Sequence, residues 1–183
     1  MTKPKDYWVR HEHGGDRCSL ETAQNLPRMP VSAILDNLRS AHNVGSAFRT
    51  SDGVGLGELL LCGYSPTPPH RHLGKTALGA EEIVPWRHFD SVEEAIAHAR
   101  ANGCQVIGME IREGSVPLQE LALNFPVTLV FGNEAEGLSP ETCEQCDVIA
   151  HLPMHGQKSS LNVSVAFGIA VYELRRKWQP VGR

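Results

Sequence analysis

The hydrophobic positions along this chain fall into short apolar runs, separated by longer stretches in which apolar residues recur with helical spacing. Short apolar runs bounded by Gly, Pro or polar clusters are typical of buried strands, and helical spacing indicates amphipathic helices. The predicted strands are residues 31–35, 58–61, 83–84, 105–111, 127–131 and 148–152. The first predicted helix follows a polar loop within residues 37–50. The other predicted helices are residues 91–103, 116–121, 139–146 and 159–178. This alternation predicts an α/β fold, a mostly parallel sheet with helices on both faces.

Polar and irregular sequence flanks the predicted domain. Residues 1–30 are rich in Pro, Gly and charged side chains, and we interpret them as a mobile arm or a wrapping segment. Residues 31–178 are the expected folded domain, residues 179–183 a short tail, and residues 63–76 a loop rich in Pro and His. The chain of 183 residues is long enough for one domain with its own core.

The last predicted helix combines an apolar surface with a polar start. It is apolar almost all round over residues 163–172, so we expect it to be buried. Asn162 and Ser164 nevertheless lie in its first turns, and a buried polar group is costly unless it finds a partner. The strand, loop and helix of residues 152–176 therefore predict a binding site at the start of this helix.

Three loops that follow predicted strands are rich in Gly and polar residues: residues 37–50, residues 131–139 and the loop before the last helix. The carboxyl ends of parallel strands share one edge of a sheet, and ligands of open α/β sheets bind there. Gly132 directly follows an apolar strand, where a missing side chain lets a ligand approach the backbone. Taken singly, residues 132–137 fit a plain turn as well as a site, and Asn43 and Arg49 are better explained as a helix cap and a solvated cation. Their convergence predicts a ligand site.

A group of glycines and a pair of cysteines do not support a dinucleotide-binding, metal or redox site. The glycines of residues 53–57 precede a strand, whereas a dinucleotide-binding loop follows one. Cys143 and Cys146 have C-x-x-C spacing without a second pair, which favours an incidental pair over a metal or redox site.

Charge and cysteine content narrow the function classes. The net charge of −4 gives no overall basic character, so a nucleic-acid surface has to be local. One cationic cluster fits either a solvated face or a phosphate contact; its members are His70, Arg71, His72, Lys75, Arg87 and His88. The five cysteines without a recognisable secretory signal favour free thiols in a reducing cytoplasm. No apolar run approaches membrane-spanning length, and we expect neither a membrane nor a metal partner.

Three ordered motifs at these loops resemble the SpoU (TrmH-like) class of the SPOUT superfamily of RNA methyltransferases. Residues 43–50 (NVGSAFRT) resemble the first motif, residues 131–139 (FGNEAEGLS) the second and residues 152–166 (LPMHGQKSSLNVSVA) the third. The resemblance covers residues 31–178, and residues 75–81 (KTALGAE) are similar to members that methylate tRNA and rRNA ribose.

The resemblance implies a carboxyl-terminal trefoil knot, an exception to the rule against knots, with S-adenosylmethionine bound in it largely by main chain. The implied cofactor contacts are Met109, Gly132, Leu152, Met154 and Leu161. The implied catalytic residues, for methyl transfer to a ribose 2′-oxygen, are Asn43, Arg49, Glu134, Ser160 and Asn162. It also implies a homodimer with the knot region in the interface, which agrees with an all-round apolar last helix.

Substrate and mechanism remain as hypotheses. We expect an RNA partner, tRNA in preference to rRNA, with Arg39, Arg71 and Lys75 as candidate contacts. The long auxiliary RNA-binding domain of some rRNA-modifying members is missing from the sequence, so we expect recognition to rest on the dimer surface and on local cationic clusters. Arg49 is either the general base or, as we favour, the cation that orients an RNA phosphate and stabilises the alkoxide, since a guanidinium does not deprotonate in proteins. The alternatives are a base methyltransferase of the same superfamily, which the motif set disfavours, and a non-catalytic RNA-binding or assembly protein with a knotted fold.

Overall fold

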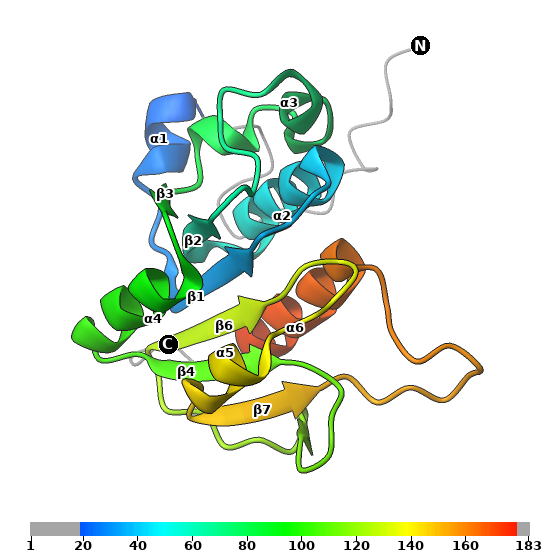
Figure 1. Ribbon diagram of the computed structural model, residues 1–183. Coiled ribbons are helices and arrows are strands. Elements are labelled where there is room, and N and C mark those ends of the chain that lie inside the picture. Colours follow the sequence, from blue (N-terminus) through cyan, green and yellow to red (C-terminus); the bar gives the residue numbers. More distant parts are fainter. Residues whose placement is uncertain (1–18, 179–183) are drawn as a thin grey trace.

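Seven strands form one parallel sheet in the computed structural model, in which residues 19–178 are described (Figure 1). Their order across the sheet is β3-β2-β1-β6-β4-β7-β5, and all neighbouring strands are parallel. The strands are β1 (Met29–Asp36), β2 (Leu56–Cys62), β3 (Trp86–Phe89), β4 (Gln105–Met109), β5 (Val116–Pro117), β6 (Val127–Phe131) and β7 (Val148–His151). The helices are α1 (Leu20–Gln24), α2 (Ala41–Val54), α3 (Arg71–Ala77), the 3-10 helix η2 (Ala80–Glu82), α4 (Val92–Ala101), α5 (Pro140–Glu144) and α6 (Val163–Lys177). The prediction of an α/β fold is confirmed.

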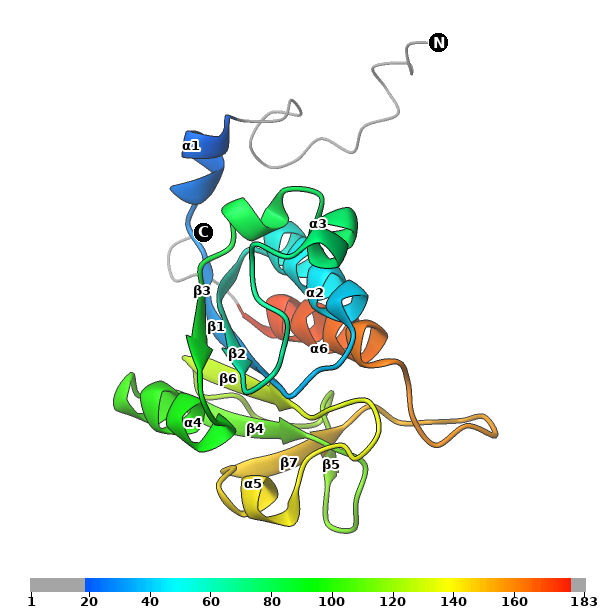
Figure 2. The same cartoon turned by 45° about the horizontal axis from the view of Figure 1, so that its top comes forward.

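The sheet separates two hydrophobic cores, because successive residues of a strand point to opposite faces. Leu35 of β1 belongs to the larger core, together with Phe48 of α2 and Phe167 of α6. The preceding residue, Ile34, belongs to the smaller core with Ile96 of α4. Figure 2 shows α2 and α6 side by side on one face of the sheet, with α4 and α5 on the other. The central strands are therefore covered on both faces, which explains their continuous apolar runs.

Local sequence explains where several helices begin and end. The Ser40 hydroxyl accepts a hydrogen bond from the backbone N–H of Asn43 at the start of α2, and Gly55 ends that helix in the left-handed conformation. Ser139 caps α5 in the same way, with Pro140 at the first helical position. No helix within residues 19–178 has the length and apolar content needed to cross a membrane.

The segment before the predicted domain is partly ordered, contrary to its prediction as irregular chain. Ser19 caps α1, and Ala23 is buried. The Arg28 guanidinium donates to the carbonyl oxygens of Leu56 and Ile83, which fastens this segment to the β2–β3 side of the sheet. β1 then begins at Met29 rather than at residue 31. Residues 1–18 of the predicted arm and the predicted tail of residues 179–183 lie outside the described part.

Several short elements differ from the prediction because contacts distant in sequence create them. The expected loop of residues 63–76 contains the start of α3, which buries Leu73 and Ala77. The strand expected at residues 83–84 is β3 instead, a half-exposed edge strand that pairs with β2. The helix expected at residues 116–121 is wrong, since Val116 and Pro117 pair with β7 as β5. β4 ends at Met109, two residues earlier than expected.

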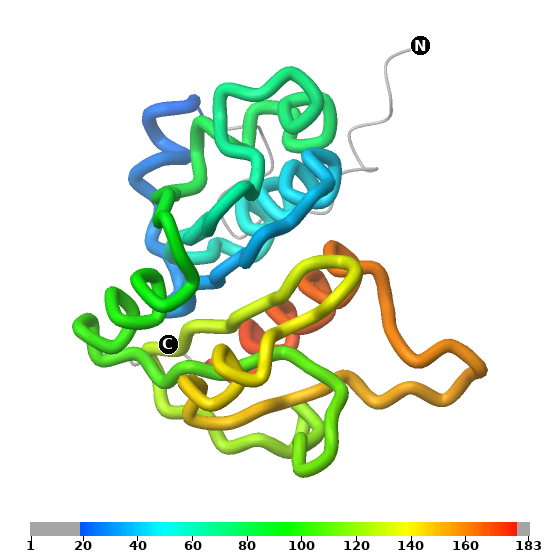
Figure 3. Tube along the Cα trace, in the orientation of Figure 1, coloured from blue at the N-terminus to red at the C-terminus, as the bar shows by residue number. Residues whose placement is uncertain are grey.

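The last helix also differs from its prediction at its start and in its burial. α6 begins at Val163 instead of residue 159, and residues 152–162 form a long loop between β7 and α6 (Figure 3). Within the single chain the helix is buried on one face only. That face includes Phe167 and Val171, whereas Ile169 and Tyr172 are 46% and 53% exposed.

Candidate active site

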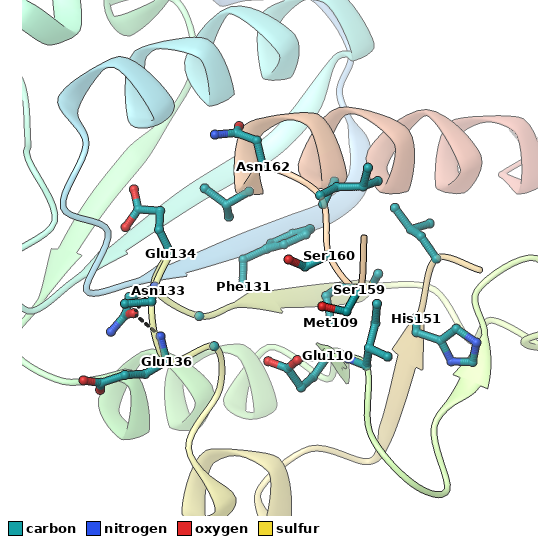
Figure 4. A pocket seen from close by; sticks show the side chains of 18 of the residues that line it. Met109, Glu110, Phe131, Asn133, Glu134, Glu136, His151, Ser159, Ser160 and Asn162 are labelled. Carbon is teal, nitrogen blue, oxygen red and sulfur yellow. Dashed lines mark hydrogen bonds between the residues drawn. The ribbon is translucent and has the colours of Figure 1, made fainter. Parts of the chain in front are cut away.

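The three predicted loops do meet at one edge of the sheet. The second and third loops line a pocket of about 610 Å³ at the carboxyl ends of β4, β6 and β7 (Figure 4). The first loop, residues 37–50, lies beside this pocket and is joined to it by hydrogen bonds to Glu134. Its lining comes from the end of β4, the loop of residues 132–137 after β6, the end of β7, and the chain that leads into α6. The pocket therefore lies where the topology of an open α/β sheet places ligands.

The loop after β6 is folded tightly on itself. A Cβ at Gly132 would collide with the backbone carbonyl of Gly137 and the amide of Leu138, so this position requires glycine. Asn133 Oδ1 accepts hydrogen bonds from the backbone N–H groups of Ala135 and Glu136, each at 2.8 Å. This turn fixes the direction in which the loop presents its acidic side chains.

Glu134 connects this loop to the start of α2. Its carboxylate accepts hydrogen bonds from the backbone N–H groups of Arg39 (3.0 Å) and Ser40 (3.2 Å) and from Asn43 Nδ2 (2.9 Å). Burial acts to raise the pKa of Glu134, but the hydrogen bonds from Arg39, Asn43 and Ser40 outweigh it and hold the pKa below its usual value.

Asn162 extends the same network to α6. Its Nδ2 donates to Asn43 Oδ1 at 3.3 Å, and its Oδ1 accepts from the backbone N–H of Ser164 at 2.9 Å and caps the helix. Asn162 and Ser164, the polar residues at the start of this apolar helix, are therefore the helix cap and its hydrogen-bond partner. Asn43, Glu134 and Asn162 form one connected group, and Ser160 lines the adjoining pocket.

The residues expected to contact the cofactor also come together. Met109, Gly132, Leu152, Met154 and Leu161 all line the pocket. Sequence reasoning missed Glu110 and His151, which line it as well. Both stand at strand ends, Glu110 directly after β4 and His151 as the last residue of β7, so an accurate prediction of the strand ends would have found them.

Arg49 is separated from the other expected catalytic residues. It lines a second cavity of about 460 Å³ between α2, α3 and α6, together with Lys75 and Tyr172. Arg39 lies in the loop before α2, and Arg71 begins α3. Within residues 19–178 no group of His, Cys, Asp or Glu side chains could hold a metal ion. Cys143 and Cys146 are both free thiols, and burial raises the pKa of Cys146 to about 12.

Comparison with known proteins defines the class of this fold and site. The chain belongs to the SpoU rRNA Methylase family, whose model matches residues 30–172. Membership implies the trefoil knot expected from the sequence. The resemblance to the SpoU class is thereby confirmed.

Individual relatives support the same assignment. The chain is 31% identical over 167 residues to the 23S rRNA (guanosine-2′-O-)-methyltransferase RlmB of Pseudomonas aeruginosa, covering 91% of this chain and 67% of that protein. The structure resembles the AdoMet-bound rRNA methyltransferase of Sinorhizobium meliloti, with a TM-score of 0.77, 28% identity and coverage of 91% of this chain and 63% of that one. It also resembles the TrmH/SpoU tRNA modifying enzyme of A. aeolicus, with a TM-score of 0.76, 29% identity and coverage of 86% and 80%. The chain spans about two thirds of the length of the curated relatives it matches.

Proposed function

We propose that this chain is an S-adenosylmethionine-dependent RNA methyltransferase that modifies a ribose 2′-hydroxyl in tRNA or rRNA. The observation that supports this most directly is the pocket at the carboxyl ends of β4, β6 and β7, with the Asn43–Glu134–Asn162 network beside it. Family membership and the AdoMet-bound relative support the same chemistry. One similar protein acts on rRNA and another modifies tRNA, so both RNAs are candidates, and tRNA is our first choice.

The pocket suits the proposed cofactor in size and lining. Its volume of about 610 Å³ falls in the usual range for small-molecule sites. The five residues expected to hold the cofactor supply apolar side chains and, at Gly132, a stretch of pocket wall without a side chain. When bound, S-adenosylmethionine supplies a methyl group that its sulfonium has already activated.

Residues of the chain have to activate the acceptor, because a ribose hydroxyl is a poor nucleophile at neutral pH. The site must hold the acceptor oxygen in line and stabilise its developing negative charge. In our proposal Asn43 orients the ribose, and Glu134 holds Asn43 and the loop after β6 in place. Ser160 and Asn162 shape the pocket wall around the bound donor.

We further propose that the active species is a homodimer and that Arg49 acts across its interface. Arg49 lines the second cavity and not the pocket, and it is not part of the hydrogen-bond network of Asn43, Glu134 and Asn162. Val165, Ile169 and Tyr172 form an exposed apolar stripe along α6, and Tyr172 adjoins the Arg49 cavity. An apolar stripe of this kind fits a protein interface, and a twofold interface would let each copy complete the other's site.

Arg39, Arg71 and Lys75 are the proposed RNA contacts. Lys75 shares its cavity with Arg49, and the other residues of that lining are Ser46, Thr50, Gly53, Thr76 and Tyr172. Two cations among hydroxyl groups, with no carboxylate in the lining, suit a phosphate of the RNA backbone.

Methylation of total RNA with radiolabelled S-adenosylmethionine tests the proposed function. We expect the label in an alkali-resistant dinucleotide, because a 2′-O-methyl group blocks cleavage at that position, and nuclease mapping then identifies the RNA. Label on a base would indicate a base methyltransferase instead. Failure to bind S-adenosylmethionine at millimolar concentration in calorimetry would contradict the proposal and favour a non-catalytic RNA-binding or assembly protein.

A further inference from the structure

The Glu110 carboxylate joins two walls of the pocket. Its Oε1 accepts a hydrogen bond from the backbone N–H of Ile111 at 2.9 Å, and its Oε2 accepts one from the backbone N–H of Leu138 at 2.9 Å. Gly137 lies directly against the carboxylate, and a Cβ there would collide with Oε2. Figure 4 shows Glu110 on the β4 side of the pocket, across from Glu134 and Asn162. These contacts hold a negative charge at a fixed place in a half-buried wall.

The other charges of the pocket do not compensate for this one. Glu134 and Glu136 also line it, whereas no Lys or Arg of residues 19–178 does. Glu134 is engaged by Asn43 and two backbone N–H groups. Glu136 is exposed, and no side-chain hydrogen bond of its carboxylate is present in the described part of the chain. Glu110 is therefore the carboxylate of this lining that is both fixed by hydrogen bonds and partly buried.

A fixed, half-buried charge acts on a ligand's charge more strongly than an exposed one, because solvent screens it less. Methyl transfer changes the ligand's charge at one atom: the donor carries a sulfonium cation, and the product carries a neutral thioether. We propose that Glu110 is a specificity-determining residue that makes the pocket prefer the charged methyl donor over its neutral product. This inference rests on the function proposed above.

Calorimetric titration of the full chain with three ligands tests the inference. The ligands are S-adenosylmethionine, S-adenosylhomocysteine and sinefungin, whose amine restores a positive charge near the position of the sulfonium. In Glu110→Gln we expect both cationic ligands to bind about tenfold more weakly and S-adenosylhomocysteine to change by less than about twofold. Glu110→Asp keeps the charge and should keep the wild-type ratio of the donor and product affinities. Glu136→Gln removes an exposed carboxylate that lines the same pocket from the loop after β6, so it is the matched control and should also keep that ratio.

Two results would overturn the inference. If Glu110→Gln weakens the binding of all three ligands equally, Glu110 only connects β4 to the loop after β6. If Glu110→Gln leaves all three affinities unchanged, the charge of Glu110 plays no part in ligand recognition. If Glu110→Gln does not fold, the wild type decides: both cationic ligands must bind it more tightly than S-adenosylhomocysteine, and tighter binding of the neutral product contradicts us. Failure of the wild type to bind any of the three ligands would instead contradict the proposed function.

Discussion

Glu134 shows how one side chain can organise a site made of distant segments. Its carboxylate holds two backbone N–H groups and the Asn43 amide, all more than ninety residues away along the chain. Hydrogen bonds to a charged acceptor are shorter and stronger than those between neutral groups. The network therefore fixes Asn43 before any substrate arrives, and preorganisation of this kind is what methyl transfer to a weak nucleophile requires.

Arg49 distinguishes the two mechanisms considered for proton removal. A guanidinium remains protonated in proteins, whereas a lysine can serve as a base once its pKa is lowered, although it lacks the planar fork. We expect Arg49→Lys to lower kcat at least about tenfold without moving the pH optimum, because it loses bidentate contacts to phosphate and alkoxide. The measurement is a pH–rate profile at saturating cofactor. A near-normal rate with a lower pH optimum would show that this residue acts as a base.

Single residues differ in how far their sequence context reveals them. The motifs identified Asn43, Glu134 and Asn162, and the structure joins these three. The motif match groups Arg49 with these residues, but the spacing of six from Asn43 turns its side chain to a different side of α2, where it lines the second cavity. The sequence does not single out Glu110, because the pattern of residues 105–111 predicts a strand that continues past it, whereas β4 ends at Met109.

At the scale of elements, the carboxyl end of α6 is fastened to the segment after β5. Lys177 Nζ donates to three carbonyl oxygens, those of Leu118 (3.0 Å), Gln119 (2.8 Å) and Leu121 (2.8 Å). Lys177 also lies in the last turn of α6, where a positive charge is favourable for the helix dipole, and these three contacts add a specific connection. The three carbonyl oxygens belong to a segment that does not form the predicted helix, since residues 118–120 are turns.

Replacing Lys177 by Met should release this connection while keeping most of the aliphatic length. Three carbonyls would lose a charged donor, and we expect a loss of about 2 kcal/mol in the free energy of unfolding. Urea denaturation measures it. Arg176→Met is the control in the same helical turn: Arg176 is exposed and pairs only with Glu173 in the described residues, so its loss should cost no more than about 0.5 kcal/mol. Equal effects of the two substitutions would contradict the clamp.

Long apolar elements were predictable from sequence, and short edge elements were not. The strand of residues 127–131 was predicted with its observed bounds, because a fully buried strand has an unbroken apolar run. α3, β3 and β5 are short or half-exposed, and they depend on pairing or packing with partners far away in sequence. Their own residues therefore contain little of the information that determines them.

At the scale of the whole molecule, the net charge of −4 requires a local surface for RNA. Arg71 and Lys75 lie one turn apart on α3, and Lys75 lines the Arg49 cavity. We expect the double variant Arg71→Ala, Lys75→Ala to bind RNA at least about tenfold more weakly and to lose part of the salt dependence of binding. Filter binding over a range of salt concentrations measures this, and calorimetry should give unchanged cofactor affinity. Equal RNA affinity in the double variant would exclude α3 from the RNA surface.

Whether Arg49 acts within one chain or across a dimer can be decided by mixing two inactive variants. Arg49→Ala and Asn162→Ala subunits are each expected to be inactive alone. If the arginine crosses the interface, every mixed dimer contains one intact site, and random exchange of equal amounts should restore about one quarter of the wild-type rate. If Arg49 acts within its own chain, no site in the mixture is intact and no activity returns. Ile169→Glu places a charge on the exposed α6 stripe, so adding it to both variants should give monomers by light scattering and abolish the rescue.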